Sequence, residues 1–202
     1  MPDPGSVPGY LSLPNVVAAD TFRAFGSSSL TRTAYGFVFR KTFRPVVSLR
    51  LTQHFLDRPR PARSRGLACR LVHRWACGKA GIDLPWNVRI GPGFYICHGW
   101  GLVVNEDVSI GSNVTAFHGV TLGRADSIEG GERSTTCPTI GDDVWLGANS
   151  FVAGDLSIGS GARVLAGTVV TDSVPPASMV GGNPGRVLKG QVEPDVVNRF
   201  VA

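Results

Sequence analysis

Between Ile140 and Ser173 an aliphatic residue recurs at every sixth position. The recurring residues are Ile140, Leu146, Val152, Ile158, Val164 and Val170, and the residue directly after each of them is mostly small. A period of six fits neither the 3.6 residues of a helical turn nor the alternation of a simple strand. Similarity at a fixed period is typical of solenoids. The sequence therefore predicts a mainly β fold, a parallel β-helix of hexapeptide repeats in which every sixth side chain points into a narrow core.

The same step continues towards the N-terminus, with two interruptions. It passes through Leu84, Ile90, Ile96 and Leu102, and then through Ile110, Ala116 and Leu122. The interval from Leu102 to Ser109 is eight residues long, which predicts two inserted residues there. The segment 123–139 departs from the period, and a polar loop of this length in a tight solenoid is a candidate functional segment. We place the β-helix domain at residues 81–190, with the loop at 123–139.

The part before the coil has a different composition. Residues 1–21 are rich in Pro, Gly and Ser and are expected to be poorly ordered. Residues 22–80 are expected to be helical. Within them, the sequence does not decide whether 22–41 forms a helix or a short apolar segment. Pro45 fits the first turn of one helix, which Pro59 and Pro61 end. A second helix, at about 63–79, carries one apolar side made of Leu67, Leu71, Val72 and Trp75. Residues 191–202 form a polar tail.

Charge is distributed unevenly along the chain. Residues 1–80 contain 13 Lys and Arg against three Asp, which gives +10, and residues 81–202 contain seven against 12 acids, which gives −5. The basic part is either a solvated helical face, which we favour, or a weak contact site for a membrane or another polyanion. No nucleic-acid-binding motif accompanies it.

Other sequence features concern the cellular location of the protein and metal binding. No run approaches the roughly 20 apolar residues that span a membrane, and no secretory signal is visible at the N-terminus. Cys69, Cys77, Cys97 and Cys137 have no zinc-type spacing. The sequence predicts a cytoplasmic protein without a metal.

Two histidines share one position in the repeat. His98 comes two residues after Ile96, and His118 comes two residues after Ala116. On a coil with three hexapeptides in each turn, both side chains lie on the same outer face, about 4.8 Å apart along the axis. A neutral imidazole can take a proton from a hydroxyl group, so the pair is a candidate for general base catalysis. Surface or interface histidines remain the alternative.

Several motifs resemble bacterial serine O-acetyltransferases and their relatives that acetylate exopolysaccharides such as colanic acid. They are the segment 81–83, the run 96–106, the segment 120–123 and Gly130-Gly-Glu-Arg133, and the similarity covers about 49–190. The resemblance implies a left-handed β-helix that assembles as a homotrimer, with acetyl-CoA between neighbouring coils. It also implies direct attack of a hydroxyl group on the thioester, without an acyl-enzyme.

The resemblance implies roles for individual residues. His98 matches the general base, and Asp83 matches the aspartate that orients it. The candidates for binding the acceptor are Glu106, His118, Arg133 and Cys97. The candidates for binding acetyl-CoA are the small residues Gly147, Ala148, Ala166 and Gly167 beside the pantetheine arm, with Arg186 and Lys189 at the phosphates.

Two departures from the family pattern concern the acceptor. Cys97 stands where the family has an aspartate beside the catalytic histidine, and Cys137 is the nearest equivalent of a second histidine. A cysteine does not supply the permanent charge that would hold the ammonium group of serine. The sequence therefore favours a sugar of a polysaccharide or its precursor as the acceptor, with L-serine as the alternative.

Two alternative functions belong to classes other than acetyltransferases. One is a β-helix that serves only as a scaffold, although a scaffold has no need of the spacing between Asp83 and His98. The other is a metal-dependent hydratase of the carbonic anhydrase type, which needs three zinc-binding histidines. Outside the predicted helices only His98 and His118 are present, which disfavours it.

Overall fold

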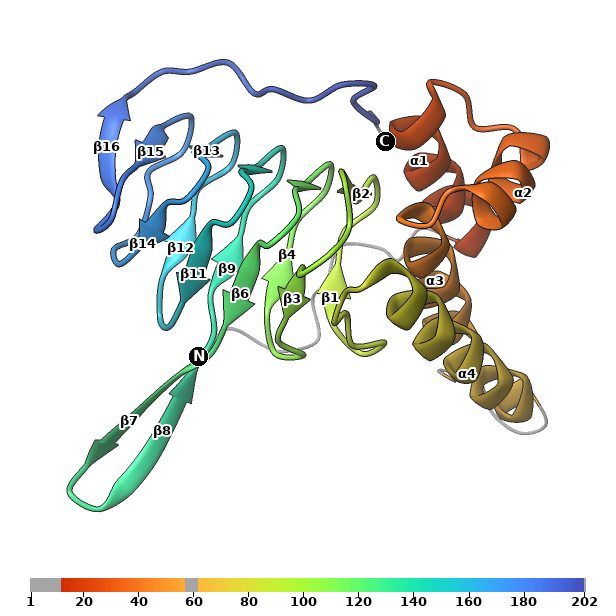
Figure 1. Cartoon of the computed structure of the whole chain (residues 1–202), viewed down its shortest axis with the longest axis horizontal. Helices are drawn as coiled ribbons and strands as arrows, with labels where there is room; N and C mark the ends of the chain where they lie inside the picture. Colours follow the sequence, from red (N-terminus) through yellow and green to blue (C-terminus); the bar gives the residue numbers. More distant parts are fainter. Residues whose placement is uncertain (1–11, 57–61, 202) are drawn as a thin grey trace.

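A computed structural model of the chain describes residues 12–56 and 62–201. Within these residues helices come first, a coil of short strands follows, and a C-terminal segment runs back along the coil (Figure 1). The helices are α1 (Leu13–Phe25), α2 (Leu30–Phe39), α3 (Phe43–Leu56) and α4 (Ala62–Ala80). The strands are β1 (Arg89–Ile90), β2 (Tyr95–Ile96), β3 (Val103–Val104), β4 (Ser109–Ile110), β5 (Thr115–Ala116), β6 (Thr121–Gly123), β7 (Ala125–Glu129), β8 (Glu132–Thr136), β9 (Thr139–Ile140), β10 (Trp145–Leu146), β11 (Phe151–Ala153), β12 (Ser157–Ile158), β13 (Arg163–Val164), β14 (Val169–Val170), β15 (Met179–Gly181) and β16 (Arg186–Lys189).

The strands of the coil form three sheets, one along each side. Their orders are β1-β4-β9-β12, β14-β11-β6-β3 and β16-β15-β13-β10-β5-β2. Neighbouring strands in a sheet come from successive turns and run parallel, apart from β16, which returns antiparallel to β15. This arrangement confirms the parallel β-helix predicted from the six-residue period.

The inward side chains are aligned from turn to turn. Ile96 pairs with Ala116, Ala116 with Leu146, and Leu146 with Val164, which lies 18 residues further along the chain. These side chains are buried, as are those of the equivalent columns on the other two sides. Each buried aliphatic side chain stabilises the coil by roughly 1.5–3 kcal/mol. One turn of three hexapeptides therefore repeats the same core layer.

The two-residue insertion lies elsewhere than the sequence predicts. Val104, and not Leu102, pairs with Leu122 in the sheet, so the step of six holds from Val104 onwards. The extra residues therefore lie in the corner between β2 and β3, which begins directly after Ile96. Leu102 and Val104 are both buried, so counting apolar residues does not distinguish the two possibilities.

The segment that departs from the period forms a hairpin. From Leu122 to Ile140 the chain takes 18 residues for a single step, and β7 and β8 pair antiparallel within this interval. The hairpin projects away from the coil (Figure 1).

The helical part differs from the sequence prediction at its start. Helix α1 begins at Leu13, inside the stretch expected to be poorly ordered, and Ala19, Asp20 and Thr21 in it are buried. Helix α2 occupies residues 30–39 of the segment 22–41 that the sequence left open. Residues 1–11, with Pro59 and Pro61, lie outside the described residues. Among the described residues, no helix has the length and apolar character needed to cross a membrane.

Helix α4 packs through a face other than the predicted one. Its buried residues are Gly66, His73, Ala76, Cys77 and Ala80. Gly66 lies so close to α3 that a Cβ there would be 2.6 Å from Cδ2 of Leu56. The two helices approach through small residues, and the predicted apolar side of Leu67, Leu71, Val72 and Trp75 is left exposed.

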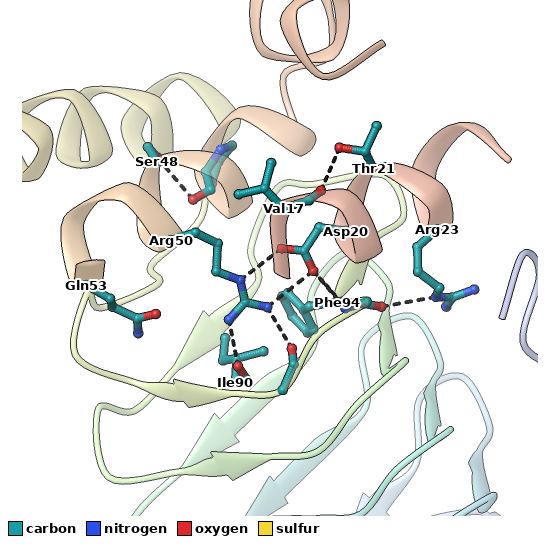
Figure 2. Close-up of polar contacts among 12 residues, drawn as sticks. Val17, Asp20, Thr21, Arg23, Ser48, Arg50, Gln53, Ile90 and Phe94 are labelled. Carbon is teal, nitrogen blue, oxygen red and sulfur yellow. Dashed lines mark hydrogen bonds and ion pairs between the residues drawn. The ribbon is translucent and has the colours of Figure 1, made fainter. Parts of the chain in front are cut away.

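A buried ion pair joins the helical part to the first turn of the coil (Figure 2). Arg50 Nε on α3 donates to Asp20 Oδ2 on α1 at 2.9 Å, and both side chains are almost fully buried. The other guanidinium nitrogens donate to the carbonyl oxygens of Ile90 and Gly91 at 2.6 Å. Asp20 Oδ1 accepts the backbone N–H groups of Gly93 and Phe94 at 2.8 and 3.0 Å. The pair therefore joins α1 to α3, and its remaining hydrogen bonds tie both helices to the same turn of the coil.

The C-terminal segment is fastened to the same region. Arg23 on α1 donates to the carbonyl oxygen of Gly93 and to that of Val197 in the tail. Arg199 forms an ion pair with Asp143 on the coil, and Asn113 bonds the backbone of Phe200. The tail thus returns to the end of the coil at which the helices lie.

Removing Asp20 should weaken the whole protein. In an Asp20→Ala variant the Arg50 guanidinium stays buried without its counter-ion, and we expect the free energy of unfolding to fall by about 3–5 kcal/mol. Urea unfolding measures it. The control is Asp195→Ala, which removes the half-exposed partner of Arg163 and should cost less than about 1 kcal/mol. Equal losses in the two variants would contradict the role given to Asp20.

Candidate functional site

One corner of the coil brings together four of the predicted site residues. The strands β2, β5, β10 and β13 are in register, so the residues two places after their inward side chains stack along one edge. These residues are His98, His118, Ala148 and Ala166. Two histidines are thus followed along the edge by two alanines. The predicted base and the predicted small residues for acetyl-CoA share this edge, which we call the histidine edge.

The two histidines are neighbours, as the repeat position predicts. Their ring centroids lie 6.5 Å apart at an interplanar angle of 72°. His98 is exposed, whereas Nδ1 of His118 is buried without a hydrogen-bond partner among the described residues. Buried polar atoms in proteins nearly always have a partner. The free nitrogen of His118 therefore leaves one hydrogen bond to be made by a bound molecule or a water.

The backbone at His98 has an unusual conformation. His98 and Trp100 have φ angles of +56° and +68°, a region that costs side-chain-bearing residues of order 1 kcal/mol or more and is found often at functional sites. Two backbone hydrogen bonds hold the corner in place. The N–H of Trp100 donates to the carbonyl oxygen of Ala80 at 3.0 Å, and the N–H of Gly101 donates to the carbonyl oxygen of Gly81 at 2.7 Å. The end of α4 therefore shapes the corner that carries His98.

Gly81 makes this contact possible. Its φ is +66°, and a Cβ at this position would overlap the ring of Trp100. The Trp100 ring also receives the ammonium group of Lys41, with Nζ 4.4 Å from the ring centroid. The helical part and the corner are thus in direct contact.

Asp83 and Glu106 share a depression beside the hairpin. The depression is open, has a volume of about 300 Å³, and is lined by Asp83, Pro85, Val103, Val104, Asn105, Glu106, Leu122 and Gly123. Asp83 is exposed and pairs with Val103 through the backbone, and Glu106 accepts a hydrogen bond from Asn87 at 2.7 Å. Within the described residues no hydrogen bond or ion pair joins Asp83 to His98. Asn87, which contacts Glu106, and Asn105, which lines the depression, were not predicted from the sequence. For Asn105 the run Asn-Glu-Asp was the available signal.

Arg133 lies apart from the histidine edge of its own chain. It is on β8 of the projecting hairpin and donates to Asp126 Oδ2 at 2.9 Å (Figure 1). Asp126 also accepts a hydrogen bond from Thr135, which, with the charges of Arg124 and Arg133, holds the pKa of the carboxyl below its usual value. The structure therefore does not bring Arg133 together with His98 in one chain.

Cys97 and Cys137, at the positions of the family's aspartate and second histidine, carry neutral thiols at pH 7. Burial raises the pKa of the Cys97 thiol. Burial, and secondly the charge of Asp107, raise the pKa of Cys137, whose Sγ lies 3.4 Å from Oδ1 of Asn105. Neither side chain supplies a negative charge to a bound molecule.

The other cofactor candidates are two glycines that adjoin the alanines of the histidine edge and two cations on β16. A Cβ at Gly147 would be 2.6 Å from the backbone nitrogen of Ala166, so coil packing alone requires this glycine, whereas Gly167 has open space around it. Arg186 on β16 pairs through the backbone with Gly181, which follows the next inward residue of this sheet, and its side chain contacts Asp172 at 3.5 Å. Lys189 is exposed, three residues further along the same strand. Among the residues that the structure describes, no group of three or more His, Cys, Asp or Glu is placed to hold a metal ion.

Comparison with known proteins identifies the family of this chain. Residues 137–172 match the family described as bacterial transferase hexapeptide (six repeats). The chain is similar to soybean serine acetyltransferase in complex with serine, with 33% identity and a TM-score of 0.68 over 88% of this chain and 70% of that one. It belongs to the serine acetyltransferase family. The fold is the left-handed parallel β-helix that the sequence resemblance implies.

Other relatives agree in family. The solved serine acetyltransferase of Neisseria gonorrhoeae has a TM-score of 0.70 and 28% identity, over 90% of this chain and 68% of that one. The serine acetyltransferase of Bacillus licheniformis is 40% identical over 126 residues, which are 62% of this chain and 56% of that protein. Serine acetyltransferase 2 of Arabidopsis thaliana is 43% identical over 115 residues, 57% of this chain and 34% of that protein. The chain thus spans about half or less of these two relatives.

These relatives overturn one prediction. The sequence favoured a sugar hydroxyl as acceptor because Cys97 and Cys137 replace charged or basic residues of the family. The serine acetyltransferases of Bacillus licheniformis, Bacillus subtilis and Mycobacterium tuberculosis each match over more than a hundred residues, which contradicts the sugar reading and supports its alternative. The similarity along the rest of the coil outweighs the substitutions at Cys97 and Cys137.

A substitution at Gly81 should disturb the histidine edge. In a Gly81→Ala variant the added methyl group displaces the Trp100 ring, and the corner moves with it. The chain has four histidines, so the ring signals in a proton–carbon NMR spectrum resolve the effect. We expect the signals of His98 and His118 to shift while that of His54 stays.

The matched control is Gly78→Ala, where a Cβ meets open space. This variant should leave the signals of His98 and His118 in place. Unchanged signals of both histidines in Gly81→Ala would show that the end of α4 does not position the corner.

Proposed function

We propose that this protein is a serine O-acetyltransferase that transfers the acetyl group of acetyl-CoA to the hydroxyl group of L-serine. Its membership of the serine acetyltransferase family is the observation that carries the proposal. The histidine edge supports it, because an exposed imidazole lies there beside a row of small residues.

His98 acts as the general base in this proposal. Its neutral imidazole takes the proton of the serine hydroxyl while the hydroxyl oxygen attacks the thioester carbonyl. The new C–O bond forms, the C–S bond breaks, and the imidazolium returns the proton to the departing CoA sulfur. No acyl-enzyme is formed. Because the acceptor attacks directly, one base near both substrates is sufficient.

Asp83 orients His98 and stabilises its imidazolium in the same proposal. The corner of His98 hydrogen-bonds to Gly81, two residues before Asp83, so the two residues belong to adjacent turns of the coil. Hydrogen bonds between catalytic groups are often formed only once the substrates are bound. We expect the contact between Asp83 and His98 to form in the complex.

Acetyl-CoA lies along the histidine edge, with its thioester beside His98. Gly147, Ala148, Ala166 and Gly167 leave room for the pantetheine arm. Five strand spacings separate β2 from β16, which is roughly 24 Å. Arg186, with Lys189 on the same strand, is thus placed to meet the phosphates at the far end of an extended CoA.

The acceptor site is completed by a neighbouring chain of a homotrimer. Arg133 lies on β8 of a hairpin that projects from its own coil (Figure 1), which suits it to reach the histidine edge of another chain. There its guanidinium pairs with the carboxylate of serine. Glu106 and Cys97 line the ammonium side, and the free Nδ1 of His118 makes a hydrogen bond to a bound substrate.

The direct test is thiol release from acetyl-CoA by the purified protein with L-serine. We expect turnover with L-serine and none with O-methyl-L-serine, which has no hydroxyl proton. Absence of turnover, together with absence of acetyl-CoA binding by calorimetry, would favour a β-helix that serves only as a scaffold.

Replacing the base should abolish most of the activity. We expect His98→Ala to lower kcat by roughly 10² to 10⁴ because proton removal from serine loses its catalyst. The same thiol assay measures it, and circular dichroism checks that the coil is intact. A His118→Ala variant should lose less, since it removes only a binding contact. If His118→Ala were the more damaged variant, the assignment of the base would be wrong.

Restoring a charge at position 97 should improve serine binding. The Cys97 thiol is neutral, so a Cys97→Asp variant adds a carboxylate for the ammonium group of serine. We expect KM for L-serine to fall roughly tenfold, the usual worth of a charge-assisted hydrogen bond, with a smaller change in kcat. Cys97→Asn, which has the same shape without the charge, is the control. An equal effect of both substitutions would remove the charge from the explanation.

A further inference from the structure

The outward side of α4 carries an apolar row that no described part of the chain covers. Leu67, Leu71 and Trp75 follow one another at intervals of four residues and are 55%, 71% and 50% exposed. Residues spaced by four lie on one side of a helix. The opposite side of α4 is the buried one. Exposed large apolar side chains in a contiguous group mark an interaction surface.

Cations flank this row on the same helix. Arg70, Arg74 and Lys79 are exposed, and Lys79 continues the row by one further step of four. Leu71, Arg74, Trp75, Gly78 and Lys79 line an open depression of about 530 Å³. The depression thus combines two cations with apolar walls.

Helix α2 extends the surface. The guanidinium carbon of Arg44 lies 4.9 Å from the centroid of the Trp75 ring, and Arg44 donates to the carbonyl oxygens of Phe37 and Val38 at 2.7 and 2.6 Å. Val38 and Phe39 are 56% and 70% exposed. We call the surface made of the exposed residues of α4 and the C-terminal half of α2 the cap face. Both helices lie at the end of the molecule away from β16 (Figure 1).

The cap face has a single sign of charge. In residues 12–56 and 62–80 the only carboxylate is that of Asp20, which is buried against Arg50. Two copies of the face would bring cations against cations, and a symmetric interface needs a patch that complements itself. The charge therefore calls for an anionic partner rather than a second copy of this face.

We propose that the cap face docks on the surface of an anionic phospholipid membrane. A helix with Leu and Trp on its outward side and Lys and Arg beside them is suited to lie in the plane of a lipid interface. Lipid phosphates pair with Arg70, Arg74 and Lys79, and the outward leucines enter the acyl boundary. An acidic polypeptide would satisfy the cations but would leave the apolar row without a partner. The inference does not depend on the identity of the acetyl acceptor.

Vesicle sedimentation with the full-length protein tests the proposal. One set of vesicles contains equal parts of phosphatidylglycerol and phosphatidylcholine, and the other contains phosphatidylcholine alone. We expect the protein to sediment with the anionic vesicles only and more weakly in high salt. A Leu67→Gln/Leu71→Gln variant should bind roughly tenfold more weakly, because both leucines are exposed and lose only their lipid contacts.

The control is Val187→Gln/Leu188→Gln on β16, which removes two exposed apolar side chains at the other end of the coil. This variant should bind as the original protein does, and circular dichroism of both variants should be unchanged. Equal binding to the two kinds of vesicle, or no effect of Leu67→Gln/Leu71→Gln, would overturn the proposal. A lower oligomer mass of that variant in light scattering would instead assign the face to a second copy. Retention on immobilised polyglutamate without vesicle binding would assign it to an acidic protein.

Discussion

The buried ion pair between Asp20 and Arg50 is the constraint on which the arrangement of the two parts depends. A guanidinium group buried in protein is tolerated only when its charge and its donors are satisfied. Here a carboxylate from α1 and the carbonyl oxygens of Ile90 and Gly91 satisfy them together. Two helices are therefore held on the first turn of the coil, and that turn leads directly into the corner of His98.

The same junction links the helices to the candidate chemistry. The last residues of α4 accept the backbone hydrogen bonds of the Trp100 corner, and Gly81 leaves the room that the Trp100 ring needs. The inserted residues lie in this corner and not further along the chain. Consequently the corner departs from the regular repeat at the position where His98 is exposed and has a positive φ.

The six-residue period was sufficient to predict the coil, because the register of a parallel β-helix follows from the spacing wherever the repeat is uninterrupted. It also predicted that His98 and His118 are neighbours. Spacing did not locate the insertion, since Leu102 and Val104 are both buried. Composition did not reveal α1 either, because its stability depends on tertiary contacts such as that of Asp20. For α4 the apolar residues suggested the packed side, but contact through Gly66 and Ala76 permits a closer approach, so the large apolar residues face outward.

The proposed acetyl transfer depends on acetyl-CoA lying along the histidine edge. A crystal structure of the protein with CoA tests this most directly. We predict the CoA sulfur within roughly 4 Å of the His98 ring, near the reach of a general base, with the pantetheine arm beside Ala148 and Ala166. A CoA molecule bound elsewhere on the coil, with His98 open to solvent, would contradict the account.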